Sequence, residues 1–141
     1  MKIWTSDELA DELFKKFNVM YSKTTDSTYI ADLPVKFFLK AKPFFSSFGI
    51  YTANVNDCDN AAVKIKDWVD TKAYKAKLPA APVALFLSYV TKGGGNHRAI
   101  LAHTDEGWKL FDGDFRNNKI RLKDLSDITR IRSDVRQGIW D

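Results

Sequence analysis

The sequence is poor in the residues that build disulfides and metal centres, since it has one cysteine and two histidines among 141 residues. One cysteine cannot form a disulfide within the chain. A zinc site needs three or four converging ligands, which one cysteine and two separated histidines do not supply. The sequence therefore predicts neither a metal nor a cofactor, and a chain of this length can instead bury a substantial apolar core.

Long hydrophobic runs are missing too. The most apolar stretches, 35–51 and 83–90, are interrupted by lysines and Pro43 or are too short to span a bilayer. Residues 1–15 carry four acidic side chains and no apolar run before a small-residue cleavage site, which is not the pattern of a signal peptide. We therefore expect no membrane insertion and a protein that acts in a reducing cytoplasm.

The charge is nearly balanced, with a formal net charge of +4. From residue 113 onward, Lys and Arg are interleaved with Asp, so no long basic block forms. Arg116, Arg121, Arg130 and Arg132 keep an RNA-binding protein as the weakest functional hypothesis, because no aromatic and basic motif of the known modules accompanies them. Nucleic acid is therefore not an expected partner.

Two amphipathic helices are predicted in a single α+β domain that spans residues 1–141. Thr5 and Glu8 have the spacing of a capping box, and apolar residues at helical spacing follow as far as about Phe17. A second helix begins at Cys58, where Asp57 is a good N-cap. Its buried stripe consists of Ala62, Ile65 and Val69.

Strands are predicted on both sides of this second helix. The apolar run 83–87 is typical of a strand that is buried on both faces. Residues 97–103 alternate in polarity, and 108–112 return after a tight turn at 104–107. Further short strands are expected at 35–39, 119–122 and 127–132, followed by a polar tail.

The aromatic residues before the cysteine allow two interpretations. Phe44, Phe45, Phe48 and Tyr51 either fill the core or line a groove beside the thiol. Core filling is the more general role of large aromatic side chains in a domain of this size.

Cys58 is the candidate nucleophile. The first turn of a helix favours a thiolate through its unpaired N–H groups and its dipole, whereas the neighbouring carboxylates of Asp57 and Asp59 disfavour it. Activation therefore has to come from an imidazole. The alternative is that Cys58 is a small buried apolar residue without chemistry.

His97 is the better candidate for the base. His103 lies about 20 Å further along the same strand face, at about 3.4 Å per residue, and adjoins a surface turn. If the turn has two central residues, position pairs across the hairpin sum to 211, which places Asp114 opposite His97 and Asp112 diagonal to it. Either aspartate could orient the imidazole, and each could instead be an ordinary turn residue.

These pieces together resemble a known superfamily. Asp57-Cys58-Asp59-Asn60, then Asn96-His97-x-Ala99, then Gly107-Trp108 and Asp112 are similar to the core of the transglutaminase-like and bacterial papain-like cysteine peptidases. The resemblance covers residues 54–114 and implies a helix headed by the cysteine and packed on an antiparallel sheet. It also implies a catalytic triad of Cys58, His97 and Asp112, with Asp114 as the alternative orienting residue.

Several positions depart from the pattern of that superfamily. Arg98 directly follows the histidine, Gly113 follows the aspartate, and no glutamine precedes the cysteine. Donors for an oxyanion must then come from elsewhere, and the candidates are Asn54, Asn56 and the backbone N–H of Cys58.

Two functional hypotheses follow. The first is a thiol-dependent hydrolase or acyltransferase that attacks an amide or ester bond in a peptide, a protein or a cell-wall peptide. The second is a catalytically inactive binding or inhibitory module on the same fold. The departures from the superfamily pattern favour this second hypothesis.

Overall fold

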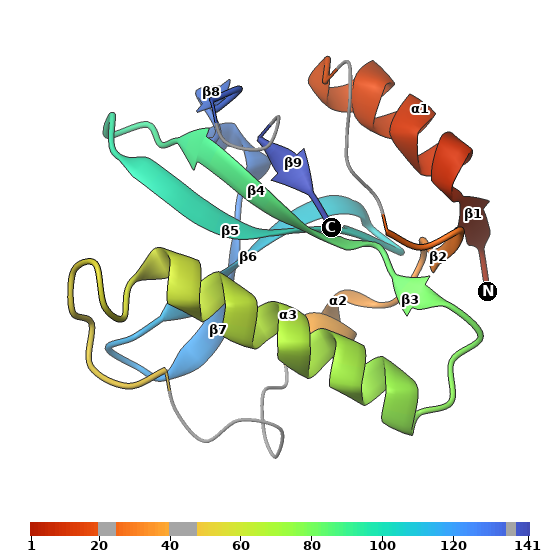
Figure 1. The fold of residues 1–141 in the computed structure, drawn as a ribbon, viewed down its shortest axis with the longest axis horizontal. Coiled ribbons are helices and arrows are strands. Elements are labelled where there is room, and N and C mark those ends of the chain that lie inside the picture. The colour runs from red at the N-terminus through yellow and green to blue at the C-terminus, as the bar shows by residue number, and fades with distance from the viewer. Residues whose placement is uncertain (20–24, 40–47, 135–137) are drawn as a thin grey trace.

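The computed structural model describes residues 1–19, 25–39, 48–134 and 138–141. It is a mixed α+β structure in which helices pack on antiparallel strands (Figure 1). In chain order the elements are β1 (Ile3–Thr5), α1 (Ser6–Phe17), β2 (Thr28–Ile30), α2 (Val35–Leu39), α3 (Cys58–Lys75), β3 (Ala81–Pro82), β4 (Ala84–Val90), β5 (Asn96–Thr104), β6 (Gly107–Asp114), β7 (Lys119–Lys123), the 3-10 turn η1 (Leu125–Asp127), β8 (Arg130–Ile131) and β9 (Ile139–Trp140).

The main sheet has the strand order β7-β6-β5-β4-β8, and β9 also pairs with β4. All of its pairings are antiparallel. A smaller sheet, β1-β2-β3, joins β1 and β2 antiparallel and β2 and β3 parallel. No helix among the described residues has the length and hydrophobicity needed to cross a bilayer.

Helices cover both faces of the main sheet (Figure 1). On one face Leu9 and Leu13 of α1 join a core with Leu85, Leu87 and Leu101 of the sheet. The opposite face is covered by α3. The core on this face combines residues of α3 with residues at alternate positions of β4 and β5. The α3 residues are Ala61, Ala62, Ile65, Trp68 and Val69, and the strand residues are Ala84, Ile100 and Ala102. Because the faces alternate with a period of two, β4 has apolar residues on both sides, as the continuous apolar run predicts.

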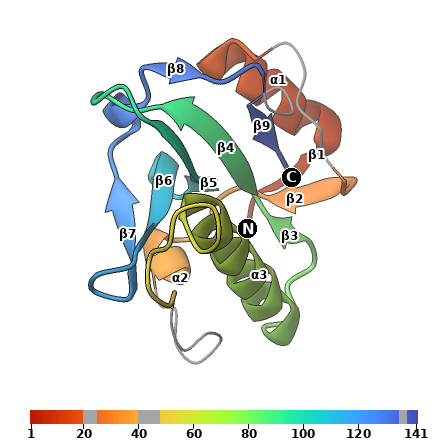
Figure 2. The ribbon, with the colours of Figure 1, turned by 60° about the vertical axis from the view of Figure 1, so that its left-hand side comes forward.

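The main sheet opens between β5 and β6. The hairpin register sums to 211 as predicted, but pairing of these two strands ends at Ile100–Phe111. Beyond that point β5 stays with β4, up to the pair Val90–Asn96, and β6 stays with β7, up to Asp114–Lys119. The pair β4–β5 therefore diverges from the pair β6–β7, and the first turn of α3 lies where the two pairs separate (Figures 1 and 2).

Close packing lets α3 approach this opening. A Cβ atom placed on Gly113 would lie 2.7 Å from Cβ of Ala61, closer than real Cβ contacts. The glycine therefore provides the space in which the start of the helix sits against β6.

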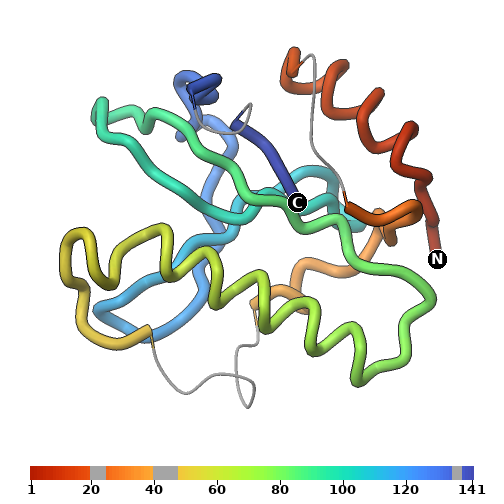
Figure 3. Tube along the Cα trace, viewed as in Figure 1, coloured from red at the N-terminus to blue at the C-terminus, as the bar shows by residue number. Residues whose placement is uncertain are grey.

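Two sequence expectations about the elements are wrong, and a third is confirmed over a shorter range. Residues 35–39 form a short helix rather than a strand, because Pro34 has the fixed φ that suits a helix start and its carbonyl accepts the N–H of Phe37. Of 127–132, only Arg130–Ile131 is a strand. The expected polar tail contains β9, which lies along β4 and buries both of its residues (Figure 3).

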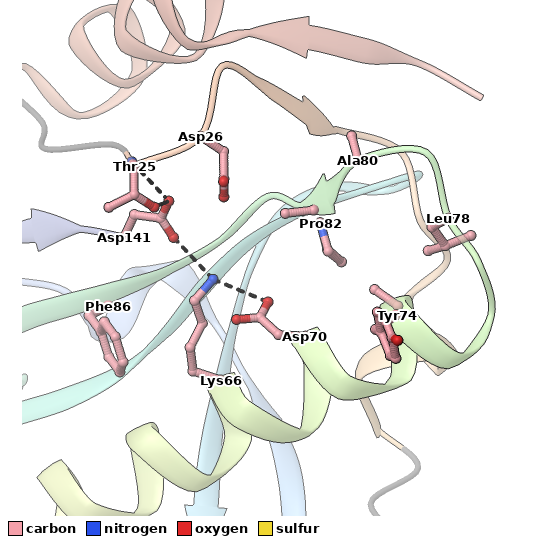
Figure 4. Close-up of a pocket in the computed structure, with 12 residues that line it drawn as sticks. Thr25, Asp26, Lys66, Asp70, Tyr74, Leu78, Ala80, Pro82, Phe86 and Asp141 are labelled. Carbon is pink, nitrogen blue, oxygen red and sulfur yellow. Dashed lines mark hydrogen bonds and ion pairs between the residues drawn. The ribbon is translucent and has the colours of Figure 1, made fainter.

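The end of the chain is held by a cluster of polar side chains, most of which line a pocket (Figure 4). Oδ2 of Asp141 accepts hydrogen bonds from the hydroxyls of Tyr29, at 2.6 Å, and Thr25, at 2.7 Å. Oδ1 of Asp141 lies 3.1 Å from Nζ of Lys66, which also pairs with Asp70 at 3.4 Å. Burial, together with Asp141, raises the pKa of Tyr29 to about 12, so its hydroxyl stays a donor. This cluster connects β9, β2 and α3.

Candidate active site

Cys58 is the first residue of α3, as the sequence predicts. Asp57 caps the helix by accepting the N–H of Asp59 at 3.2 Å, while the side chain of Asn60 accepts the N–H of Asp57 at 3.0 Å. As the first helical residue, Cys58 has a backbone N–H without a partner inside the helix. The thiol is half-buried and lines a pocket together with His97 and Asp112.

His97 lies between the thiol and a buried carboxylate. Its Nε2 atom is 2.9 Å from Oδ1 of Asp112, a distance that suits an ion pair, although the N–H does not point straight at the oxygen. The ring also makes an edge contact with Tyr89, with 5.6 Å between ring centroids. Nδ1 is then the ring nitrogen left to interact with Cys58.

The surroundings of His97 favour its protonated form. Burial alone would lower the pKa of His97, but its interactions with the side chains of Asp112 and Cys58 raise it to about 9. In general, a cation beside a thiol favours the thiolate.

Asp112 is held as a carboxylate despite its burial. Its side chain is 2% exposed, which alone would raise its pKa, but His97, Lys123 and Arg121 lower the pKa instead. Oδ2 lies 3.2 Å from Nη2 of Arg121, and Oδ1 accepts the N–H of Gly113 at 2.8 Å. One oxygen thus faces the imidazole while the other faces a guanidinium.

Asp114, the alternative orienting residue, forms its hydrogen bonds with Asn117. Its carboxylate accepts hydrogen bonds from Nδ2 and the backbone N–H of Asn117, at 2.8 and 3.1 Å. It lines the pocket but closes the β6–β7 turn. The strands part after Ile100–Phe111, so the direct cross-strand pairing of His97 with Asp114 does not form.

His103 is remote from this pocket and adjoins the exposed β5–β6 turn, as the sequence predicts, but its ring is packed against other side chains. Its ring packs between Trp4 and Trp108, at centroid distances of 4.6 and 5.0 Å, and its Nδ1 contacts the carbonyl of Ala31. His103 is a packing residue because its cross-strand partner Trp108 and the nearby Trp4 both contact its ring.

The two asparagines considered as oxyanion donors lie in the loop before α3. Nδ2 of Asn56 donates to the carbonyls of Phe48 and Ile50, at 2.7 and 3.1 Å, which takes up both of its N–H groups. Asn54 has a φ of 64° and donates its backbone N–H to Asp57 at 3.1 Å. Neither asparagine is among the residues that line the pocket, whereas Cys58 is, and this favours the backbone N–H of Cys58 as the donor.

The aromatic residues before the cysteine divide between the two roles that the sequence allows. Phe48 is fully buried in the core and Tyr51 is exposed on the wall of the pocket, where it meets Phe115 edge-on at 5.4 Å. Phe44 and Phe45 lie outside the described residues.

A carboxylate also touches the thiol. Oδ1 of Asp59 lies 3.7 Å from Sγ of Cys58, and the same oxygen lies 3.6 Å from Nε of Arg98. Arg98 additionally donates to Ser88 at 3.1 Å and stacks over Trp140. The arginine that departs from the superfamily pattern therefore partly neutralises the charge next to the sulfur.

Comparisons of the chain with family models, with curated proteins and with solved structures found no match. The functional argument therefore depends on the geometry of the pocket.

A metal-binding interpretation has little support in this pocket. Asp57, Cys58 and Asp59 do place ligand-type atoms within 4.8 Å of one another. The carboxylate of Asp57 already accepts the N–H groups of Asn54 and Asp59, so helix capping explains this arrangement.

Sequence reasoning did not identify Arg121 as part of this site. In the sequence it is one of several dispersed basic residues, whereas in the structure it lies on the pocket wall and contacts Asp112. Arg121 lies directly opposite Asp112 in the pairing of β6 with β7. Its place in the site can therefore be recognised only when that pairing is known.

Proposed function

We propose that the protein is a thiol-dependent hydrolase or acyltransferase of papain-like or transglutaminase-like build. The observation that supports this most is the position of His97, whose imidazole interacts with both the Cys58 thiol and the buried Asp112 carboxylate in one pocket. Cys58 would be the nucleophile, His97 the acid and base, and Asp112 the group that orients the imidazole.

The reaction would begin with attack of the Cys58 thiolate on the carbonyl carbon of an amide or ester. A sulfur–carbon bond forms, and the negative charge on the carbonyl oxygen is stabilised by the backbone N–H of Cys58. The bond to the leaving group then breaks, and the leaving nitrogen or oxygen takes the proton of His97. The product of this step is a thioester on Cys58.

The second step releases the acyl group. Water or an amine attacks the thioester, His97 accepts the proton of the attacking group, and the sulfur–carbon bond breaks. Attack by water gives hydrolysis and attack by an amine gives transfer. A peptide, a protein or a cell-wall peptide supplies the kind of amide that this chemistry requires.

Alkylation of Cys58 by iodoacetamide tests the proposal without a known substrate. We expect the rate to stay high below pH 7, where an ordinary thiol, with a pKa of about 8.5, reacts slowly. His97→Ala should lower the rate at pH 6 at least about tenfold, because the cation that stabilises the thiolate is lost. The single cysteine makes the modified site unambiguous in mass spectrometry. A rate and pH profile that His97→Ala leaves unchanged would contradict the proposal.

An inactive binding module is the second candidate, because the amide of Asn56 is occupied and Asp59 contacts the thiol. Cys58→Ala separates the two functions. Full biological activity of that variant would leave only the binding role, whereas an enzyme would lose its turnover.

A further inference from the structure

Arg121 presents unused hydrogen-bond donors to the pocket. Its Nη2 atom lies 3.2 Å from Oδ2 of Asp112, which is its ion-pair partner among the described residues, and its side chain is 49% exposed. A guanidinium has five N–H donors in a planar fork. Most of these donors are therefore free to meet a ligand beside Cys58 and His97, which line the same pocket.

The other charges around this wall are already engaged. Lys123 is paired with Asp127 at 3.1 Å and lies 3.8 Å from Asp112. The carboxylate of Asp114 is bonded to Asn117. Among the described residues of the wall, Arg121 thus combines a permanent positive charge with solvent-facing donors. Tyr51 and Phe115 supply an apolar surface next to it.

We propose that Arg121 binds a carboxylate of the substrate, so that the site selects amides or esters that carry an anionic group close to the scissile carbonyl. This inference rests on the proposed function and adds a substrate class to it. Arginine suits the role because its fork matches the two oxygens of a carboxylate. Arg121 would be a specificity-determining residue, and its contact with Asp112 would keep the fork beside the thiol.

Two alkylating reagents that differ in charge test this inference. Iodoacetate and iodoacetamide both form a sulfur–carbon bond with Cys58 and release iodide, but only iodoacetate carries a carboxylate next to the reacting carbon. We expect Arg121→Gln to lower the ratio of the iodoacetate rate to the iodoacetamide rate about three- to fivefold, the range of an exposed ion pair. Arg121→Lys keeps the charge and should retain part of the ratio.

Lys119→Gln is the matched control, because it removes a cation from the same strand at an exposed position outside the pocket. The ratio should not change in this variant. Increasing salt should lower the ratio of the unmodified protein toward that of Arg121→Gln, because exposed charges are screened.

An equal loss of both rates in Arg121→Gln would overturn the inference, since the arginine would then act only through Asp112. An unchanged ratio would overturn it as well. If Arg121→Gln does not fold, as judged by circular dichroism, the salt dependence of the unmodified protein decides alone. Failure of the proposed function is a separate result, because it is measured by the effect of His97→Ala on the rate of iodoacetamide alkylation.

Discussion

The charge beside the Cys58 sulfur depends on two neighbours, Asp59 and Arg98. The carboxylate of Asp59 lies 3.7 Å from Sγ and opposes a thiolate, while Arg98 lies 3.6 Å from the same carboxylate oxygen. Arg98 thus partly compensates for the negative charge that Asp59 places next to the sulfur of Cys58.

We predict that Asp59→Asn raises the rate of Cys58 alkylation at pH 6 about two- to fivefold and that Arg98→Gln lowers it by a similar factor, the range of partly exposed charge pairs. The double variant should approach the rate of Asp59→Asn, because Arg98 then has no charge to neutralise. Iodoacetamide kinetics of the four proteins form a double-mutant cycle. Additive effects in the double variant would show that the two residues act independently.

At the scale of elements, the start of α3 is fitted against β6. The contact depends on Gly113, where a Cβ atom would lie 2.7 Å from Ala61 and 3.2 Å from the ring of Phe48. The helix carries Cys58 and the strand carries Asp112, so this contact also fixes the distance across the pocket.

Gly113→Ala should therefore destabilise the protein by about 1–3 kcal/mol, the usual cost of overpacking, and should slow Cys58 alkylation because the helix start is displaced. Adding Ala61→Gly removes the clashing methyl group and should restore the alkylation rate. The free energy of unfolding should recover only in part, since glycine in a helix costs about 1 kcal/mol. Urea unfolding and iodoacetamide kinetics measure the two effects, and an alkylation rate that Gly113→Ala leaves intact would contradict the role of this contact.

At the scale of the whole molecule, the last strand is tied to the main helix by charge. The side chain of Asp141 is 4% exposed and pairs with Lys66 of α3 at 3.1 Å. Burial alone would raise the pKa of Asp141, but Lys66, Tyr29 and Thr25 lower it below its ordinary value. A carboxyl group with a lowered folded-state pKa stabilises the fold above the unfolded pKa of about 3.9, and this contribution is lost as the pH falls through the folded value.

Lys66→Met should lower the free energy of unfolding at pH 7 by about 3 kcal/mol, because it leaves the Asp141 carboxylate buried without its cation. The difference between the variant and the unmodified protein should shrink below about pH 4, where a protonated carboxyl needs no cation. Lys15→Met, at an exposed position of α1, is the control and should have little effect. A deficit of equal size at pH 7 and pH 3 would mean that Lys66 acts through packing alone.

Local patterns in the sequence determined the two long helices, α1 and α3, and the central hairpin. The capping box of Thr5 and Glu8, the N-cap Asp57 and the register of β5 with β6 depend on residues a few positions apart, so they could be predicted from the chain alone. The candidate residues Cys58, His97 and Asp112 could be named for the same reason, because each lies at the end of a predictable element.

Tertiary structure decided what surrounds those residues. Pairing of β5 with β6 stops at Ile100–Phe111, and this separation leaves Asp112 rather than Asp114 beside His97. Arg121 reaches the pocket through the pairing of β6 with β7. β9 joins β4, although 48 residues lie between Val90 and Ile139, only because the folded sheet offers it an edge. Contacts between residues far apart in the sequence have no local periodicity to reveal them, so only the packed sheets and helices determine them.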